Sequence, residues 1–522
     1  MLKCTINGKS VEVPEGTSII EAFKLAGADI AHYCWHPGLS VAGVCRLCMV
    51  EIEGNPRLQI ACNTPIQEGM VVNNQSEMVK DAVKWGLDFH LINHPLDCPI
   101  CDQAGECGLQ DQYMKFGQYD SEMGQAKVKK KKVVDLGEKI VLDSERCILC
   151  SRCVRFTEEV SKTNELGIFN RGDHSEIGTY AGRPLNNPYA VNTVDICPVG
   201  ALTSKDFRFR QRVWFLKDKP SVCTGCSTGC NVDVYYNQEG MWRVKPRHSQ
   251  VNGYWMCDHG REIYKATNPV MTDFVGERGK KKALKRQNRL MQVKKSQDSA
   301  WQYLDSADTL KRLQASLSNV KKAALVVTGQ YSTQEYQALL GFWKSQFSGE
   351  NIYHWINHPD KLADFDGLLI RGDKNPNTKG LQQVAGQLGL SLKTDIPNFA
   401  DFDLAIVAGP ENQWVFEDIK EKASLFAKAE NVYWMSSCLV PQAEEQKGNW
   451  TFIPTKTFAE KSGTFVNHAG VEQHFEKVDL FVDQALSLTE IAHILKGENV
   501  LLQNHEHVHR VHNEFIHERG HV

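Results

Sequence analysis

The chain has 522 residues, which is too long for one hydrophobic core, so several domains are expected. Its 42% hydrophobic and 24% charged residues are typical of a globular protein, and a net charge of −3 argues against a nucleic-acid-binding protein as a whole. No apolar run approaches the roughly 18 residues that a transmembrane helix needs, and the N-terminus lacks the pattern of an export signal. A secreted or integral membrane protein is therefore not expected.

The cysteines are the unusual feature of the sequence. There are 17, an odd number, and all except Cys438 lie between Cys4 and Cys257. In a long chain without an export signal, a disulfide framework is the weaker interpretation. Short spacings instead indicate thiolates that converge on metal centres, and the chain contains four such groups.

The first group follows a predicted small sheet. Strand-like segments at 5–13, 49–53 and 70–72 and a helix over 18–26 surround it. The close pair Cys45 and Cys48 can bind one iron from a tight turn, and two more distant cysteines complete a [2Fe–2S] site. Gly43 lets the backbone approach the cluster. A zinc site is the alternative. The ligands in this group are Cys34, Cys45, Cys48 and Cys62.

The second group combines three cysteines with one histidine: His94, Cys98, Cys101 and Cys107. A neutral imidazole in place of a thiolate lowers the negative charge of a [4Fe–4S] cluster and changes its potential. The same residues suit zinc, and His90 could replace His94, since both lie on one helical face. His94 is the better candidate because it is nearer to the cysteines and directly precedes Pro95, where a helix is expected to end.

The third group has the run C-x2-C-x2-C and a remote cysteine followed by proline: Cys147, Cys150, Cys153 and Cys197. This arrangement is typical of a [4Fe–4S] cluster. Arg146, Arg152 and Arg155 crowd the run, and their charges would favour the reduced cluster unless they are merely solvated at the surface.

The fourth group has the spacing C-x2-C-x3-C-x26-C and consists of Cys223, Cys226, Cys230 and Cys257. Four thiolates again fit one [4Fe–4S] cluster, with a zinc ribbon as the alternative. Cys4 and Cys438 remain and are most simply small buried hydrophobic residues. The sequence thus predicts one [2Fe–2S] and three [4Fe–4S] clusters.

Four stretches carry a specific resemblance: GVCRLCMVEIEG, NHPLDCPICDQAGECGLQDQ, RCILCSRCVRF and VDICPVGALTSK. Through them the chain resembles the large iron–sulfur subunit of respiratory complex I, the NADH–quinone oxidoreductase, in a short bacterial form. The fourth group is similar to a site related to the N-terminal domain of molybdopterin oxidoreductases. The resemblance is strong over about the first 260 residues and weaker beyond.

The resemblance implies a function, partners and a location. Electrons from NADH would leave a flavin in a neighbouring subunit and pass through the clusters of this chain toward quinone, with the fourth cluster off the main path. The implied partners are the flavin/NADH-binding subunit, a downstream two-cluster ferredoxin-type subunit and other peripheral-arm subunits. No nucleic acid is expected, and the chain would lie at the cytoplasmic face of the plasma membrane, held there only by the complex.

The implied fold is multidomain, α+β and α/β. It begins with a β-grasp [2Fe–2S] ferredoxin domain at 1–78 and a helical His/Cys segment at 79–120. A ferredoxin-like [4Fe–4S] domain at 121–215 and a molybdopterin-oxidoreductase-type [4Fe–4S] domain at 216–275 follow. A basic linker at 276–298, a cofactor-less α/β domain at 299–500 and a histidine-rich tail at 501–522 complete the chain.

The second half has the pattern of an α/β domain. Strands are predicted at 323–327, 368–370 and 404–407, with a helix over 332–345. Segments 372–381 and 458–473 resemble the cofactor domain of molybdopterin oxidoreductases. However, Cys438 lies too near the chain end to serve as a molybdenum ligand, and His259 stands where such enzymes carry a lysine. No molybdopterin is therefore expected.

Two segments are notable for their charge or composition. Residues 278–295 contain nine Lys or Arg and no acidic residue, which favours an exposed linker, with contact to an acidic partner or lipid as the alternative. The tail carries six histidines between His505 and His521; His505, His509 and His512 would share a helical face. Such a tract can chelate a divalent metal, but an incidental polar tail is the simpler interpretation.

The sequence contains neither a dinucleotide nor a phosphate-binding fingerprint and no nucleophile set, so no catalytic residue is assigned. An electron-relay subunit of NADH–quinone oxidoreductase is the expected function. The alternatives are the relay subunit of an NAD-linked hydrogenase or formate dehydrogenase, or a catalytic molybdopterin oxidoreductase.

Overall fold

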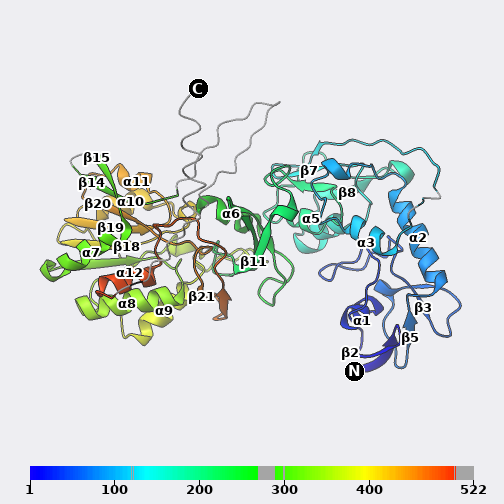
Figure 1. Cartoon of the computed structure of the whole chain (residues 1–522), viewed down its shortest axis with the longest axis horizontal. Helices are drawn as coiled ribbons and strands as arrows, with labels where there is room; N and C mark the ends of the chain where they lie inside the picture. The colour runs from blue at the N-terminus through cyan, green and yellow to red at the C-terminus, as the bar shows by residue number, and fades with distance from the viewer. Residues whose placement is uncertain (119, 121–122, 268–288, 298–299, 499, 501–522) are drawn as a thin grey trace. The chain divides into compact units, whose positions relative to one another are not determined.

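The computed structural model describes residues 1–118, 120, 123–267, 289–297, 300–498 and 500. The chain divides into two compact units, Met1–Leu216 and Lys217–Val522, which are described separately below (Figure 1). The predicted histidine-rich tail and most of the predicted basic linker lie outside the described residues. The finer division into domains stays a prediction.

Unit 1 begins with a five-stranded sheet in the order β2-β1-β5-β3-β4. The strands are β1 (Leu2–Ile6), β2 (Lys9–Val13), β3 (Met49–Ile52), β4 (Gln59–Ile60) and β5 (Val71–Asn73). Helix α1 (Ile19–Leu25) begins at a capping box between Ser18 and Glu21 and buries Ile19, Ile20, Ala22 and Phe23. The predicted small sheet with one helix is therefore confirmed.

The rest of unit 1 consists of short elements packed around one shared core. Its main helices are α2 (Glu77–Leu91) and α3 (Gly108–Phe116), with short turns at α4 (Arg152–Arg155) and α5 (Asn192–Asp195). Strands β6 (Val134–Asp135), β7 (Ile140–Leu142) and β10 (Leu202–Ser204) form one small sheet, and β8 (Leu166–Phe169) pairs with β9 (Glu176–Thr179). Leu47, Leu87, Leu109, Ile140 and Leu202 belong to a single buried cluster, so all three predicted cluster-bearing segments of unit 1 share a core.

Unit 2 opens with an antiparallel sheet of three strands, β11 (Lys217–Val222), β12 (Asn231–Asn237) and β13 (Gly240–Pro246). Helix α6 (Asp258–Thr267) packs on β13. Lys217 to Thr267 therefore form one small layer of sheet and helix.

A seven-stranded sheet dominates the remainder of unit 2, in the order β15-β14-β20-β19-β18-β16-β17. Its strands are β14 (Val293–Gln297), β15 (Ala300–Leu304), β16 (Ala323–Val327), β17 (Ile352–His354), β18 (Leu404–Ala408), β19 (Asn431–Ser436) and β20 (Trp450–Pro454). Strands β16 to β20 are parallel to one another, whereas β14 runs antiparallel to both of its neighbours, β15 and β20. A separate hairpin joins β21 (Gly463–Val466) and β22 (Glu472–Phe475).

Helices cover both faces of this sheet (Figure 1). Leu325 and Val327 of β16 face a core formed with α7 (Ser306–Ser316), α8 (Thr333–Phe347), α9 (Thr378–Gln387) and α12 (Leu488–Leu495). Ala324 and Val326 face the opposite core, formed with α10 (Ile419–Phe426) and α11 (Pro441–Glu444). Because successive strand residues point to opposite faces, a continuous apolar strand is what a sheet buried on both sides requires.

Two local predictions in unit 2 differ from the structure. Residues 368–370 are not a strand: the Asp366 Oδ1 atom accepts hydrogen bonds from the amides of Leu368, Leu369 and Ile370, at 2.9, 3.0 and 3.0 Å. These amides are therefore used by a side chain and not by a neighbouring strand. Residues 293–297, assigned by sequence to the linker, form β14 within the large sheet.

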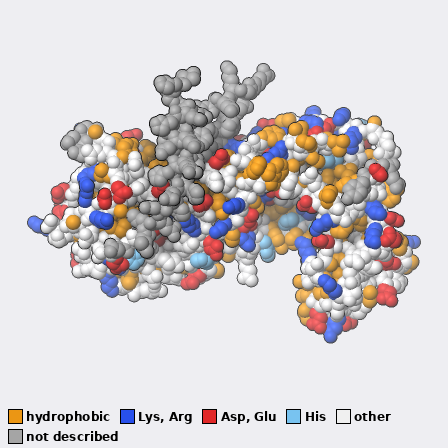
Figure 2. Space-filling model, viewed as in Figure 1, with side chains coloured by type: hydrophobic (Ala, Val, Ile, Leu, Met, Phe, Trp, Pro, Cys, Tyr) orange, Lys and Arg blue, Asp and Glu red, His pale blue; other side chains and the backbone are white. Residues whose placement is uncertain are grey.

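The surface and the helices agree with the composition. On the face drawn in Figure 2, Lys and Arg side chains are interspersed with Asp and Glu over both units, in keeping with the net charge of −3. Within the described residues, no helix is both long and apolar enough to cross a membrane.

Candidate metal centres

The first group lies in the long loop before β3 and just after β4. All four thiols are buried. They form two pairs: the Cys45 thiol donates to Cys34, and the Cys48 thiol donates to Cys62. The hydrogen bond from Cys45 lowers the pKa of Cys34 to about 5. Gly43 has a φ of +64° beside Ile60, a conformation that favours glycine.

The second group lies in the segment between the end of α2 and the start of α3. Cys98 opens a short 3-10 turn and is exposed, whereas Cys101 and Cys107 are buried. Cys107 is the residue that precedes α3. Burial lowers the pKa of His94 to about 4, and the charges of Arg146 and Lys127 add to this shift, so the imidazole is neutral as a metal ligand must be.

The two candidate histidines of this group differ in their hydrogen bonds. The Nδ1 atom of His90 lies 2.6 Å from the carbonyl oxygen of Gly86, one turn earlier in α2. In contrast, the Nδ1 atom of His94 is buried without a hydrogen-bond partner. An unpartnered buried nitrogen is costly unless something else binds it, and this favours His94 over His90 as the ligand.

The third group lines a single small cavity together with apolar side chains. Cys147, Cys150, Cys153 and Cys197 all contribute to its wall, along with residues such as Leu142, Ile177 and Leu202. Burial raises the pKa of Cys147 to about 12 and that of Cys150 to about 11. Thiols gathered in an apolar cavity favour deprotonation only if a cation neutralises them, which the irons of a cluster do.

The fourth group connects the small sheet of unit 2 to α6. Cys223 follows β11, Cys230 precedes β12, and Cys257 precedes α6. The Cys223 amide donates to the Cys230 carbonyl oxygen at 2.8 Å, which closes the loop that carries three of the thiols. A Cβ atom on Gly260 would lie 3.0 Å from the sulfur of Cys223 and 3.5 Å from that of Cys257, so the glycine permits both thiols to approach α6.

The α/β part of unit 2 holds this fourth loop in place. The Ser227 amide donates to the Asp373 carbonyl oxygen at 2.9 Å, and the Gln473 side chain donates to the Gly229 carbonyl oxygen at 2.6 Å. The His468 amide donates to the Ser227 carbonyl oxygen at 2.8 Å. The segments 372–381 and 458–473, which resemble a cofactor domain, therefore contact the fourth cysteine group.

The donor sets can be tested against the predicted clusters. In the described part of the chain, no three His, Cys, Asp or Glu side chains are grouped as ligands of a single metal ion. Three observations fit clusters: the two thiol pairs of the first group, the unpartnered His94 nitrogen, and the shared cavity of the third group. Cys4 and Cys438 are buried and lie in none of these groups, as the sequence predicts.

Two contacts that the sequence did not predict join the groups of unit 1. The Arg155 guanidinium donates to the carbonyl oxygens of Cys34 and Cys150, and so links the first and third groups. The Cys107 sulfur lies 3.9 Å from the Pro198 carbonyl oxygen, which links the second and third groups. Gly200, two residues after Pro198, could have been noticed in the sequence as a small residue close to the predicted ligand Cys197.

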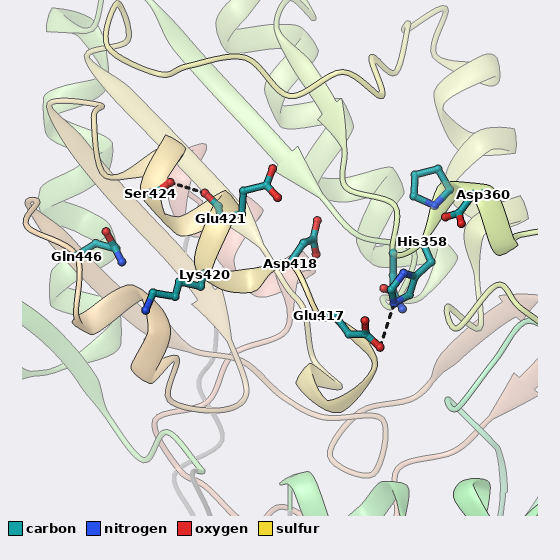
Figure 3. Close-up of a pocket in the computed structure, with 10 residues that line it drawn as sticks. His358, Asp360, Glu417, Asp418, Lys420, Glu421, Ser424 and Gln446 are labelled. Atoms are coloured by element: carbon teal, nitrogen blue, oxygen red, sulfur yellow. Dashed lines mark hydrogen bonds and ion pairs between the residues drawn. The ribbon is translucent and has the colours of Figure 1, made fainter.

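A hollow elsewhere in unit 2 is unrelated to the cysteines. It has a volume of about 730 Å³ and is lined by polar residues that include His358, Glu417 and Lys420. Figure 3 shows these side chains around the hollow, with the imidazole of His358 facing the carboxylate of Glu417 at 3.4 Å. None of the four cysteine groups contributes to it.

Four known domain families match the chain in sequence order. Residues 1–77 match the 2Fe-2S iron-sulfur cluster binding domain, and residues 86–122 match the NADH-ubiquinone oxidoreductase-G iron-sulfur binding region. Residues 137–203 match the ferredoxin-like domain of NADH-quinone oxidoreductase subunit 3. Residues 216–269 match the molybdopterin oxidoreductase Fe4S4 domain. The chain thus contains both 2Fe-2S and 4Fe-4S cluster-binding domains.

Individual relatives agree with these matches. The NADH-quinone oxidoreductase G subunit of Rickettsia bellii is 39% identical over 51% of this chain and 39% of its own length. The G subunit of Streptomyces coelicolor is 41% identical over 53% of this chain and 34% of its own length. The mitochondrial NADH dehydrogenase [ubiquinone] iron-sulfur protein 1 of Solanum tuberosum is 35% identical over 74% of this chain and 50% of its own length. The chain spans half of the length of these relatives or less.

A solved NAD+-reducing [NiFe]-hydrogenase in the H2-reduced state is 31% identical, with a TM-score of 0.37, over 41% of this chain and 91% of that one. The matched domains follow one another along the chain, and both the bacterial and the mitochondrial relatives are subunits of NADH–quinone or NADH–ubiquinone oxidoreductase. The cluster-binding half of the chain is therefore similar to the large iron–sulfur subunit of NADH–quinone oxidoreductase.

Proposed function

We propose that the chain is the electron-relay subunit of an NADH–quinone oxidoreductase, accepting electrons from a flavin subunit and passing them toward quinone. The observation that carries this proposal is the contact between three cysteine groups within unit 1. Electron tunnelling slows steeply with distance, so a relay needs its redox centres side by side, and the protein supplies their spacing and electrostatics.

The proposal assigns one cluster to each group. The sequence placed the close pair Cys45 and Cys48 on one iron, but the hydrogen bonds support a different pairing. Cys34 and Cys45 would hold one iron of a [2Fe–2S] cluster, and Cys48 and Cys62 the other. Each of the other three groups would hold one [4Fe–4S] cluster. The ligand sets of those three are His94, Cys98, Cys101 and Cys107; Cys147, Cys150, Cys153 and Cys197; and Cys223, Cys226, Cys230 and Cys257.

The contacts within unit 1 support an order for the relay that differs from the order of the sequence. Arg155 joins the first group to the third, and the segment after Cys197 joins the third to the second. The third group is therefore the central one. We infer that electrons pass from the [2Fe–2S] cluster to the Cys-ligated [4Fe–4S] cluster and then to the His-ligated one.

The surface around the second group suits the exit to a partner. Cys98 is exposed, and the nearby Leu96, Ile100, Trp214 and Phe215 expose 90%, 63%, 57% and 64% of their surface. The Arg212 side chain fixes this region by donating to the carbonyl oxygens of Cys101 and Pro99, at 2.6 and 2.7 Å. Exposed apolar groups around a redox centre fit contact with another protein of the complex that carries the next cluster, a two-cluster ferredoxin-type subunit.

The fourth group lies in unit 2, and we infer that its cluster stands off the main path. The chain would contact the membrane only through the other subunits of the complex, and it would lie at the cytoplasmic face of that membrane.

The proposal is tested by metal analysis of the anaerobically purified chain without its histidine-rich tail. We expect about 14 irons per chain and neither stoichiometric zinc nor molybdenum. Stoichiometric molybdenum would contradict the proposal and indicate a catalytic enzyme. Co-purified subunits then identify the complex: a hydrogenase or formate dehydrogenase partner would contradict the assignment to quinone reduction.

A second test uses single cysteine variants in the assembled complex. Cys150→Ala should remove one [4Fe–4S] signal from the electron paramagnetic resonance spectrum and stop quinone reduction, while NADH still reduces the flavin. Cys438→Ala is the matched control, because Cys438 is buried but belongs to no group. Quinone reduction at the normal rate in Cys150→Ala would place that cluster outside the path.

A further inference from the structure

Arg155 is a buried arginine whose contacts reach two different cysteine groups. Only 8% of its surface is exposed. Its guanidinium donates to the carbonyl oxygens of Cys34 and Ser40 in the first group's loop and, at 3.4 Å, to that of Cys150 in the third group. Its Nε atom donates to the Ser151 hydroxyl at 3.2 Å. All of these acceptors are neutral.

Arg152, three residues earlier, has the same kind of surroundings. Its guanidinium donates to the Trp35 carbonyl oxygen at 2.6 Å and to the Ile196 carbonyl oxygen at 3.1 Å. Trp35 follows Cys34 in the first group, and Ile196 precedes Cys197 in the third. Both arginines therefore bridge the backbone of the same two groups.

Neither arginine has a carboxylate partner within the described residues, and this distinguishes Arg155 from the other buried arginines. Arg146 lies 3.2 Å from Asp143, Arg261 lies 3.9 Å from Asp258, and Arg289 is paired with Glu460 at 2.5 Å. The carboxylate of Glu159, which is near Arg155 in the sequence, instead accepts from the amide and hydroxyl of Ser40. The interpretation of these arginines as solvated surface residues thus does not hold for Arg155.

A buried charge without a counter-charge is expensive, so the missing negative charge must be supplied by something that binds here. The thiols beside the arginines are the available source. The Arg155 guanidinium bonds to the backbone of Cys34 and Cys150 themselves, and that of Arg152 to the residues next to Cys34 and Cys197.

We propose that Arg155, assisted by Arg152, is the shared counter-charge of the first and third clusters and raises the reduction potential of both. Each cluster gains one negative charge when it accepts an electron, and a nearby cation in a low-dielectric interior stabilises that reduced state. One side chain thereby keeps two neighbouring centres easy to reduce. This inference rests on the proposed function, because it requires that both clusters are bound.

The test is a redox titration of the full chain followed by electron paramagnetic resonance, which separates the [2Fe–2S] signal from the [4Fe–4S] signals. Arg155→Gln removes the charge but keeps an amide donor, whereas Arg155→Lys keeps the charge but cannot reach both carbonyl oxygens. Arg183→Gln is the control, because it removes the same charge from an exposed position of unit 1.

We expect Arg155→Gln to lower the potential of both clusters, with the ratio of reduced to oxidised cluster falling about tenfold at a fixed potential, or about 59 mV for one electron. Arg155→Lys should stay close to the wild type, and Arg183→Gln should be unchanged because solvent screens its charge. Arg152→Gln should shift both potentials in the same direction, and it tests the inference independently if Arg155→Gln does not fold.

Two results would overturn the inference. Unchanged potentials in Arg155→Gln would show that the charge is not felt by the clusters. Equal shifts in Arg155→Lys and Arg155→Gln would show that the contact geometry matters and the charge does not. A wild-type chain without a [2Fe–2S] signal would contradict the proposed function itself, and the inference with it.

Discussion

Gly200 faces the sulfur of Cys101 so closely that no side chain fits between them. A Cβ atom placed on Gly200 would lie far inside the van der Waals distance from the Cys101 sulfur and 3.1 Å from the Cβ of Gln103. Gly200 is the third residue after Cys197, so the loop that carries a predicted ligand of the third group is packed directly on a predicted ligand of the second. The two groups are therefore mechanically coupled at this glycine.

We predict that Gly200→Ala displaces Cys101 and removes the His-ligated cluster while the other clusters remain. Overpacking of this kind costs about 1–3 kcal/mol, and the loop relieves it by moving the thiol. The iron content should fall by about four per chain. Gly124→Ala is the control, since nothing lies within 4 Å of its added Cβ. A full iron content in Gly200→Ala would mean that the thiol at 101 is not a ligand.

The choice between His94 and His90 gives a second prediction. His94→Cys should keep a cluster at the second site but lower its reduction potential, because a thiolate replaces a neutral imidazole. His90→Gln should leave the potential unchanged, because the Nδ1 atom of His90 is already bonded to the Gly86 carbonyl oxygen, whereas that of His94 is buried without a hydrogen-bond partner. Redox titration of both variants decides the point; the opposite pattern would make His90 the ligand.

The cysteine groups could be predicted from sequence because short spacings along the chain almost alone bring thiolates together. The regular spacing of apolar residues likewise predicted β16, β18 and α8. The contact of Gly200 with Cys101 joins residues that are 99 positions apart, and no local pattern encodes it. Residues 368–370 were predicted as a strand because they are apolar, but the preceding Asp366 binds their amides and competes with strand formation.

The same distinction applies to the charged residues. The sequence indicated that Arg152 and Arg155 crowd the third group, but burial and the identity of their acceptors depend on the approach of a loop more than 100 residues away. The fourth group likewise depends on Gln473, which lies 244 residues from Gly229. The predicted ligands are thus identified from local sequence patterns, whereas the residues that hold them in place come from distant parts of the chain.

A third prediction concerns this support. Gln473→Ala should destabilise the loop of the fourth group by about 1–3 kcal/mol, because the Gly229 carbonyl oxygen loses its donor in a buried position. The fourth cluster should then be lost preferentially, while the signals of the three clusters in unit 1 persist.

Gln334→Ala is the matched control for this experiment. The Gln334 side chain also bonds to the β21–β22 hairpin, at Thr464 with a distance of 3.0 Å, but the pair is exposed and does not contact the cysteine loop. Equal loss of the fourth cluster in both variants would show that general stability of unit 2, and not the contact with Gly229, retains it.

The last prediction concerns the buried carboxylate of Glu411, which follows β18. Burial raises the pKa of Glu411 from 4.5 to about 7, and the nearby charge of Glu335 adds to the rise, whereas Lys461 at 3.8 Å opposes it. Between these two pH values the folded chain holds a proton that the unfolded chain has released. The free energy of unfolding of unit 2 should therefore decrease as the pH rises from about 4.5 to 7, and stay low above.

Glu411→Gln should abolish this decrease, because an amide stays neutral at every pH. At pH 8 the variant should be more stable than the wild type by on the order of 3 kcal/mol, whereas at pH 4.5 the two should be similar. Denaturant unfolding, followed by the fluorescence of the buried Trp434 and Trp450, measures both values. Glu476→Gln changes an exposed carboxylate of the same unit and should leave the pH profile unaltered. If Glu411→Gln and the wild type showed the same pH profile of stability, Glu411 would have to be ionised in the folded chain. Lys461 would then be shared between the carboxylates of Glu411 and Glu335, and not bound chiefly to Glu335 at 3.0 Å.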